Sequence, residues 1–219
     1  MKNFELPKLV IFDMDGTMLD TEPVSLKAML HAGTELGVEI KREVAESLMG
    51  KSMVRCRQIL RENYGEGFDL DRALNIHKDY VMSHYEKNGV PIKAGIYELL
   101  DKLDGMGIKK AVATSTGKQA ALWKLSNAKI GNRFEVIIGG DEVENGKPSP
   151  DIFLKAAADC GIPPADCVVI EDTEAGILGA TAASIRVIAV PDIAPLTQEI
   201  RAKTFAICKD LHAVAEMFK

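Results

Sequence analysis

Cysteine and histidine are scarce in this sequence, and neither residue falls into a metal-binding pattern. Four cysteines and four histidines are spread over 219 residues without a CxxC pair. Scattered cysteines of this kind are typical of reduced, structural thiols, so we expect a cytoplasmic protein. The histidines lack metal-ligand spacing, and we expect them on helix surfaces or in the core.

Long hydrophobic runs and an excess of positive charge are also missing. No apolar run approaches the length that crosses a bilayer. The opening residues, MKNFELPKLVIF, contain a Glu and a Pro where a signal peptide needs an unbroken apolar stretch. Lysine and arginine number 27 against 32 Asp and Glu, which gives a net charge of -5. We therefore expect neither a membrane nor a nucleic acid as a partner.

Short apolar, β-branched runs recur along the chain and predict strands. They are near-continuous rather than alternating, which is typical of strands covered on both faces. Helical stretches lie between most of them, and this alternation predicts an α/β protein with a doubly wound parallel sheet. The predicted strands are 9–12, 109–114, 135–140, 167–171, 186–190 and 205–208, and the predicted helices are 94–106, 118–128, 150–160, 175–183 and 196–203.

One long segment interrupts this alternation after the first predicted strand. It contains no convincing strand, and its apolar residues have helical spacing over 24–36, 41–48, 53–63 and 71–87. We therefore predict a helical cap domain at residues 21–91, inserted into an α/β core that comprises residues 1–20 and 92–219.

Polar residues follow four of the predicted strands at their carboxyl ends, where ligands bind in an open parallel sheet. Crowded carboxylates would repel one another unless a cation lay among them, and oxygen ligands of this kind suit Mg²⁺. A lysine, a hydroxyl and helix-start N–H groups suit a phosphoryl group. Each motif alone is also typical of a turn or a helix cap, but their coincidence favours a site. The motifs are Asp13-Met14-Asp15-Gly16-Thr17, Thr114-Ser115-Thr116-Gly117, Gly146-Lys147-Pro148 and Glu171-Asp172-Thr173.

At these residues the sequence resembles the haloacid dehalogenase-like (HAD) hydrolase superfamily. It is most similar to the capped phosphatases and β-phosphoglucomutase-like enzymes, and the resemblance covers nearly the whole chain. DMDGTMLDTEP resembles the first motif of the superfamily, VATST the second, GKPSPDIF the third and VVIEDTEAGI the fourth. The first and fourth motifs are specific in combination. The resemblance implies a Rossmann-like HAD core with a cap, and a phosphoric monoester hydrolase activity.

The resemblance also implies a role for each acidic residue of the site. Asp13 would be the nucleophile that forms a phospho-aspartate, and Asp15 would be the general acid and base. Asp172, assisted by Glu171, would complete a Mg²⁺ site that includes Asp13 and the carbonyl of Asp15. The expected substrate is a small phosphate ester, with sugar phosphates as the favoured class.

Three further residues would hold the phosphate, and another lies where the chain enters the cap. Thr114 and Lys147 would bind the phosphoryl oxygens, with Ser115 lending its backbone N–H. Asp20 is expected to have a capping or hinge role.

Phosphomutases of the same subgroup are the first alternative. They keep a histidine and additional cations in the cap, whereas Ser25, Met53 and Ile76 stand at the corresponding places here. These departures favour a phosphatase. Lys51 and Arg55 are the candidate substrate-binding residues of the cap.

Other activities fit the sequence less well. A dehalogenase of this superfamily lacks the second aspartate of the first motif, and a phosphonatase needs a cap lysine for a Schiff base. The second alternative is a non-catalytic phospho-ligand-binding or receiver-like protein that uses the same sheet edge. A receiver would lack the helical insertion, and both this insertion and Asp15 argue against the alternative. We expect a monomer.

Overall fold

The computed structural model describes residues 4–49, 51 and 53–219, and these residues contain one six-stranded parallel sheet. The strand order is β3-β2-β1-β4-β5-β6, so β1 lies in the interior between β2 and β4. The strands are β1 (Leu9–Phe12), β2 (Lys109–Ala113), β3 (Val136–Ile138), β4 (Cys167–Glu171), β5 (Arg186–Ala189) and β6 (Ala206–Ile207).

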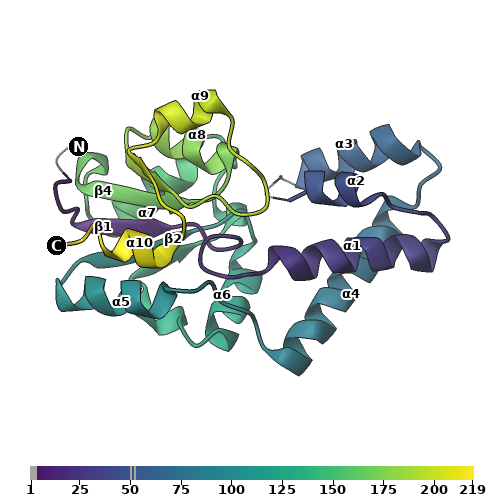
Figure 1. Cartoon of the computed structure of the whole chain (residues 1–219), viewed down its shortest axis with the longest axis horizontal. Coiled ribbons are helices and arrows are strands. Elements are labelled where there is room, and N and C mark those ends of the chain that lie inside the picture. The colour runs from purple at the N-terminus through teal and green to yellow at the C-terminus, as the bar shows by residue number, and fades with distance from the viewer. Residues whose placement is uncertain (1–3, 50, 52) are drawn as a thin grey trace.

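Helices cover both faces of this sheet. Successive side chains of a strand point to opposite faces, and both faces carry apolar side chains that must be covered. In β1, Val10 and Phe12 join one apolar cluster, and Leu9 and Ile11 join a second cluster on the other face. The first cluster includes side chains of α5 (Ile96–Gly105), α6 (Lys118–Asn127) and α10 (Leu211–Ala215). The second includes side chains of α7 (Asp151–Asp159), α8 (Glu174–Ala182) and α9 (Gln198–Lys203). The predicted doubly wound fold is confirmed (Figure 1).

Four helices follow β1 before the chain returns to the sheet, and they lie together beside it (Figure 1). They share an apolar cluster of their own, in which Leu60 is fully buried. The helices are α1 (Glu22–Leu36), α2 (Arg42–Ser47), α3 (Met53–Tyr64) and α4 (Leu70–Asn88). We call α1–α4 the four-helix unit, and its division from the core at residues 21 and 91 remains a prediction.

The two segments that connect the four-helix unit to the sheet run side by side. The N–H of Asp20 donates to the carbonyl of Pro91 at 3.0 Å, and the N–H of Lys93 donates to the carbonyl of Met18 at 2.9 Å. The Lys93 ammonium also lies 2.9 Å from a carboxylate oxygen of Asp20. The segment that enters the four-helix unit and the segment that leaves it are therefore bonded to each other.

The structure differs from the predicted elements mainly at the C-terminus. Helix α10 was not predicted, because its five residues are too few to show a periodic pattern. Asp210 caps it by accepting a hydrogen bond from the N–H of Ala213 at 2.8 Å. Among the described residues, none of the helices combines the length and the apolarity that a bilayer crossing requires.

Candidate active site

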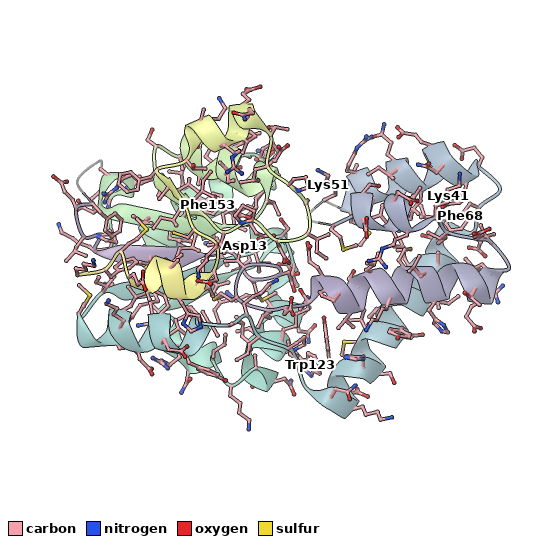
Figure 2. All side chains as sticks on the ribbon, viewed as in Figure 1. Asp13, Lys41, Lys51, Phe68, Trp123 and Phe153 are labelled. Atoms are coloured by element: carbon pink, nitrogen blue, oxygen red, sulfur yellow. The ribbon has the colours of Figure 1, made fainter. Side chains whose placement is uncertain are left out.

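The first and fourth strands bring three carboxylates together at the carboxyl edge of the sheet. Phe12 of β1 is in register with Ile170 of β4, and the N–H of Asp13 donates to the Ile170 carbonyl at 3.0 Å. The residues that follow these two positions must therefore be neighbours. Carboxylate oxygens of Asp13, Glu171 and Asp172 lie within 4.8 Å of one another, and all three residues are buried. Asp13 is labelled in Figure 2.

Lys147 reaches this cluster from the loop between β3 and α7. Its ammonium contacts a carboxylate oxygen of Asp13 and lies 2.9 Å from Oε2 of Glu171, and its side chain is only 4% exposed. Burial by itself would lower the pKa of Lys147, but the charges of Asp13 and Glu171 outweigh burial and raise it. The lysine is thus held as a cation between Asp13 and Glu171.

Glu171 orients Lys147 rather than pointing freely into the site. Its Oε1 accepts hydrogen bonds from the N–H and the hydroxyl of Thr173 at 2.9 and 2.8 Å, while Oε2 faces Lys147. Helix α8 leaves room for this carboxylate because position 176 is glycine. A Cβ on Gly176 would lie 1.8 Å from Oε2 of Glu171.

Asp172 is held by the turn that follows β1. The hydroxyl of Thr17 donates to Oδ1 of Asp172 at 2.6 Å. Gly16 adopts a left-handed φ of 87°, which glycine adopts without strain. A Cβ on Gly16 would lie 2.4 Å from Oδ2 of Asp172, so a side chain here would displace the carboxylate. The Asp-Gly-Thr sequence thereby places Asp172 beside Asp13.

The burial of these acids makes their charged forms costly. Burial and the neighbouring Glu171 raise the pKa of Asp13 to about 8, although Lys147 opposes the shift. Burial and Glu171 also raise the pKa of Asp172 well above its usual range. A bound divalent cation would remove this repulsion. Three clustered carboxylates, with a glycine that leaves space for Asp172, form a donor set of hard oxygens that fits Mg²⁺.

Asp15 lies in a different electrostatic environment from Asp13. Its Oδ1 accepts hydrogen bonds from the hydroxyl of Thr21 and the ammonium of Lys124, both at 2.8 Å, and its Oδ2 accepts from the hydroxyl of Thr116 at 2.7 Å. Burial would raise the pKa of Asp15, but Lys124 and the hydroxyl donors outweigh it and lower the pKa. The two aspartates of the first motif are therefore each bound by a lysine of their own.

The predicted phosphate-binding residues of the second motif follow β2, which neighbours β1. Thr114 is buried, and its hydroxyl accepts the N–H of Thr116 at 3.1 Å. Ser115 is exposed at the same edge. The structure thus brings Thr114, Ser115 and Lys147 to the edge that carries Asp13, because the carboxyl ends of parallel strands meet at one edge of the sheet.

The two predicted cap residues lie differently with respect to the carboxylate cluster. Lys51 lines a cavity of about 140 Å³ together with Glu22 and Asp172, so it faces the site (Figure 2). The guanidinium of Arg55 lies 3.4 Å from a carboxylate oxygen of Glu62 within α3. Of the two, Lys51 is the one that the structure places against the predicted metal ligands.

Several residues of the site were given no role from the sequence, although Thr17 and Thr116 lie within its motifs. Asp172 accepts a hydrogen bond from Thr17, and Asp15 accepts hydrogen bonds from Thr21, Thr116 and Lys124. Glu22 is a buried acid that lines the cavity. Burial, and the charge of Asp192, raise the pKa of Glu22 to about 7. The only sequence signal for Glu22 was its position directly after Asp-Thr in the first motif.

One position that departs from the mutase pattern contacts a histidine. The hydroxyl of Ser25 on α1 lies 2.9 Å from Nε2 of His77 on α4. Burial, together with the nearby charge of Lys124, lowers the pKa of His77. A histidine of α4 thus contacts one of the three positions that depart from the mutase pattern.

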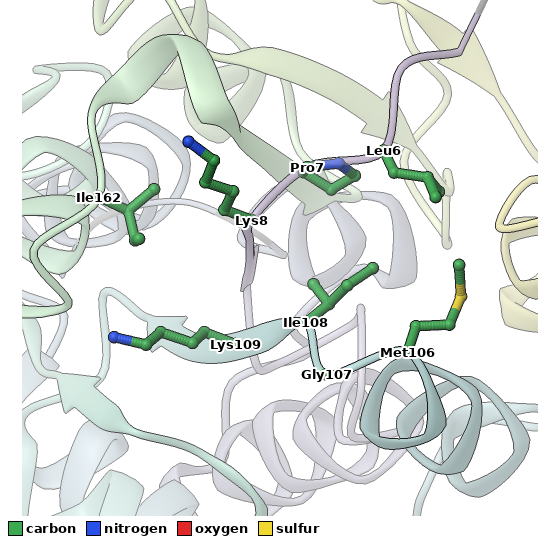
Figure 3. Close-up of a pocket in the computed structure, with 8 residues that line it drawn as sticks. All are labelled: Leu6, Pro7, Lys8, Met106, Gly107, Ile108, Lys109 and Ile162. Atoms are coloured by element: carbon green, nitrogen blue, oxygen red, sulfur yellow. The ribbon is translucent and has the colours of Figure 1, made fainter.

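A larger cavity lies at the opposite end of the sheet and is separate from the site. Its volume is about 350 Å³, and it is lined by Leu6, Lys8, Met106, Ile108 and Lys109 among others (Figure 3). These residues precede or begin β1 and β2, whereas the carboxylates follow the strand ends. This cavity has no contact with the acidic cluster.

The chain is similar to enzymes of known families. The family model of the haloacid dehalogenase-like hydrolases matches residues 10–190. A phosphorylated carbohydrates phosphatase from Thermotoga maritima is 33% identical over 80% of this chain and 81% of its own length. The β-phosphoglucomutase of Bacillus subtilis is 30% identical over 86% of this chain and 85% of its own length.

A solved structure has the same fold. CbbY from Rhodobacter sphaeroides, in complex with phosphate, superposes with a TM-score of 0.80 over 95% of this chain and 96% of that chain, at 23% identity. The predicted family and the prediction of an enzyme are confirmed by these matches. The chain therefore belongs to the haloacid dehalogenase-like hydrolases, in the subgroup of phosphatases and β-phosphoglucomutase-like enzymes.

Proposed function

We propose that the protein is a Mg²⁺-dependent phosphatase that hydrolyses a small phosphorylated metabolite, with sugar phosphates as the favoured class. The observation that carries this proposal is the convergence of Asp13, Glu171, Asp172 and Lys147 at one edge of the sheet. This arrangement combines a nucleophile, a cation site and a buried ammonium within contact distance. The similarity to the Thermotoga maritima phosphatase supports the substrate class.

In the first step, the phosphoryl group passes from the substrate to Asp13. A carboxylate oxygen of Asp13 forms a bond to phosphorus while the bond between phosphorus and the leaving oxygen breaks. Asp15 gives its proton to the leaving oxygen, so the product departs as an alcohol. The negative charge of the bound phosphate ester would oppose the effect of Lys124 and favour the protonated carboxyl of Asp15. Lys147 and the hydroxyl of Thr114 bind the oxygens of the group in transfer, with the N–H of Ser115.

In the second step, water regenerates Asp13. The Asp15 carboxylate takes a proton from the water while the water oxygen forms a bond to phosphorus. The bond between phosphorus and Asp13 then breaks. Inorganic phosphate leaves, and Asp15 is again protonated for the next cycle. The same side chain thus acts as an acid in one step and as a base in the other.

Magnesium would be held by the side chains of Asp13 and Asp172, with Glu171 assisting and the Asp15 carbonyl completing the protein ligands. When bound, Mg²⁺ supplies charge neutralisation between the attacking carboxylate and the phosphoryl oxygens. The residues themselves fit the ion because they are buried carboxylates whose negative charges repel one another when no cation lies between them.

The four-helix unit would act as the cap, and residues 21–91 would form it. It would exclude bulk water from the phospho-aspartate and contact the part of the substrate that leaves. Lys51 and Glu22 line the cavity beside Asp172, so they are placed to meet that leaving group. Arg55 remains a candidate of lower priority, because its guanidinium contacts Glu62.

A sugar-phosphate mutase is the second candidate function. The relative from Bacillus subtilis is named β-phosphoglucomutase, and His77 lies against Ser25, one of the three positions that depart from the mutase pattern. A mutase would return the phosphoryl group from Asp13 to a second hydroxyl of the bound sugar instead of to water.

The test is a panel of phosphate esters that includes glucose phosphorylated at either position, assayed with and without Mg²⁺. We expect free phosphate to be released, and release to stop when the metal is chelated and to resume when Mg²⁺ is added back. Isomerised glucose phosphate without free phosphate would favour the mutase. No product with any divalent metal would overturn both candidates.

A further inference from the structure

Lys124 is a half-buried cation beside Asp15 to which the reaction described above gives no role. Its ammonium lies 2.8 Å from Oδ1 of Asp15, and the two side chains are 18% and 27% exposed. The residue lies within α6, which begins at Lys118 directly after the predicted phosphate-binding segment. Lys124 is six positions after Lys118, which corresponds to about 9 Å along a helix.

The helix geometry explains how so distant a residue reaches the sheet edge. Side chains of an α-helix tilt toward its N-terminus, and the N-terminus of α6 points to the carboxyl ends of the strands. The four-carbon stem of Lys124 therefore extends back along the helix to Asp15. The sequence separation of 109 residues makes this contact invisible in any local motif.

The hydrogen bonds of Asp15 distinguish its two carboxylate oxygens. Oδ1 accepts from Thr21 and Lys124, whereas Oδ2 accepts from Thr116 alone among the described residues. A carboxylate offers roughly four lone-pair positions, two on each oxygen. Both positions of Oδ1 are occupied, so the remaining position is on Oδ2.

We propose that Lys124 is a positioning residue for Asp15, and that by occupying Oδ1 with Thr21 it makes Oδ2 the atom that carries and transfers the proton. This inference rests on the proposed function, because it assigns a role within the same reaction. Lys124 pairs with Asp15, whereas Lys147, the lysine assigned to the phosphoryl group, pairs with Asp13.

The leaving group of the substrate gives a test that a merely structural lysine would not satisfy. An alkyl phosphate needs a proton on its leaving oxygen, whereas p-nitrophenyl phosphate releases a stable anion without one. The parameter kcat/KM reports the steps up to departure of the leaving group, where the two esters differ. We therefore compare kcat/KM for glucose 6-phosphate and for p-nitrophenyl phosphate in the full-length, Mg²⁺-loaded protein.

For Lys124→Met, we expect kcat/KM to fall by about 10- to 100-fold with the alkyl ester and by less than about threefold with the aryl ester. The range is a part of the 10²- to 10⁴-fold that general acid catalysis typically contributes. Lys124→Arg keeps a cationic N–H donor, so the ratio of its kcat/KM values for the two esters should return close to the wild-type ratio. If Lys124→Met does not fold, as judged by circular dichroism, Lys124→Gln serves for the same comparison.

Two controls identify the route of the effect. Lys155→Met removes another helical lysine that pairs with an aspartate, Asp159 at 3.0 Å, and should leave both values unchanged. In an Asp15→Asn background, adding Lys124→Met should change the alkyl value by less than about twofold, because the two residues act as one unit.

An equal loss with both esters, or no loss with either, would overturn the positioning role. A full additional loss in the Asp15→Asn background would also overturn it, because Lys124 would then act independently. A wild-type protein that hydrolyses neither ester would instead overturn the proposed function, and this inference with it.

Discussion

Asp13 and Asp15 are two positions apart in the sequence, yet they have opposite electrostatic surroundings. Asp13 lies among carboxylates, and its pKa is raised to about 8 by burial and by Glu171. The pKa of Asp15 is lowered, because Lys124 and three hydrogen bonds outweigh burial. Environments that separate the protonation behaviour of two like side chains are typical of sites that assign them different tasks.

Substitution of the two aspartates should therefore reduce turnover to different extents. We expect Asp13→Asn to abolish turnover, because no carboxylate remains to form the phospho-aspartate. Asp15→Asn should slow turnover by about 10²- to 10⁴-fold, the usual range for loss of a general acid and base. Both are measured as phosphate release under saturating Mg²⁺, and a fully active Asp13→Asn protein would refute the assignment.

Glu22 gives a prediction about stability in the metal-free protein. Burial raises its pKa from 4.5 to about 7, so the folded state binds this proton more tightly than the unfolded chain does. The stability that it contributes is complete below pH 4.5 and is lost as the pH rises through about 7. Glu22→Gln cannot ionise, and it should therefore be more stable than wild type at pH 8 by about 1–2 kcal/mol, after allowance for solvent screening.

Chemical denaturation at pH 5 and pH 8 measures this effect. The exposed Glu98→Gln substitution controls for the loss of one negative charge. A difference between Glu22→Gln and wild type that is the same at both pH values would contradict the prediction.

The residues that sequence reasoning identified and those that it missed differ in a physical way. Asp13, Asp172 and Lys147 stand directly at strand ends or in short motifs, so their place at the sheet edge follows from the fold. Lys124 and Thr21 contact Asp15 through side chains whose direction depends on helix orientation. Contacts of this kind require the three-dimensional arrangement.

At the scale of elements, the β1–β4 pairing and the start of α8 determine the site. The turn after β4 passes directly into α8, whose third residue is Gly176. An alanine at this position would raise helix propensity by about 1 kcal/mol, yet its Cβ would lie 1.8 Å from Oε2 of Glu171. The clash should move the carboxylate that orients Lys147.

We therefore expect Gly176→Ala to lower kcat/KM at least about tenfold. Gly105→Ala is the matched control, because a Cβ at this glycine of α5 meets nothing within 4 Å. The control should retain full activity. Equal activity of the two variants in a phosphate-release assay would show that Glu171 has no part in holding Lys147.

The elements themselves were predictable wherever their pattern was long or their burial continuous. All six strands and the nine longer helices were expected close to their observed bounds within the described residues. The two exceptions are α10, whose five residues offer no period to detect, and β6, which was expected over 205–208 and shortens to Ala206–Ile207 at the sheet edge. The strand order could not be derived, because it depends on packing between distant segments.

At the scale of the whole molecule, the four-helix unit has an apolar cluster that is separate from the two clusters of the sheet. A unit with its own core can lose stability while its neighbour keeps it. Leu60 is fully buried in this cluster, and Leu60→Ala should destabilise the unit by about 2–5 kcal/mol.

Hydrogen exchange followed by mass spectrometry locates this loss. We expect faster exchange in α1–α4 of Leu60→Ala, with unchanged protection in β1 and β4. Leu100→Ala, in the cluster that contains β1, is the reciprocal control and should affect the sheet. Loss of protection throughout the chain in Leu60→Ala would contradict the predicted division at residues 21 and 91.

The phospho-aspartate on residue 13 is the claim on which the whole account depends. It is tested most directly by acid-quenching the enzyme during turnover of a ³²P-labelled ester and mapping the label to a peptide. The account predicts label on the peptide that contains Asp13, dependent on Mg²⁺ and absent from Asp13→Asn. Rapid phosphate release with label on another residue, or with no labelled protein even when Asp15→Asn slows the second step, would contradict it.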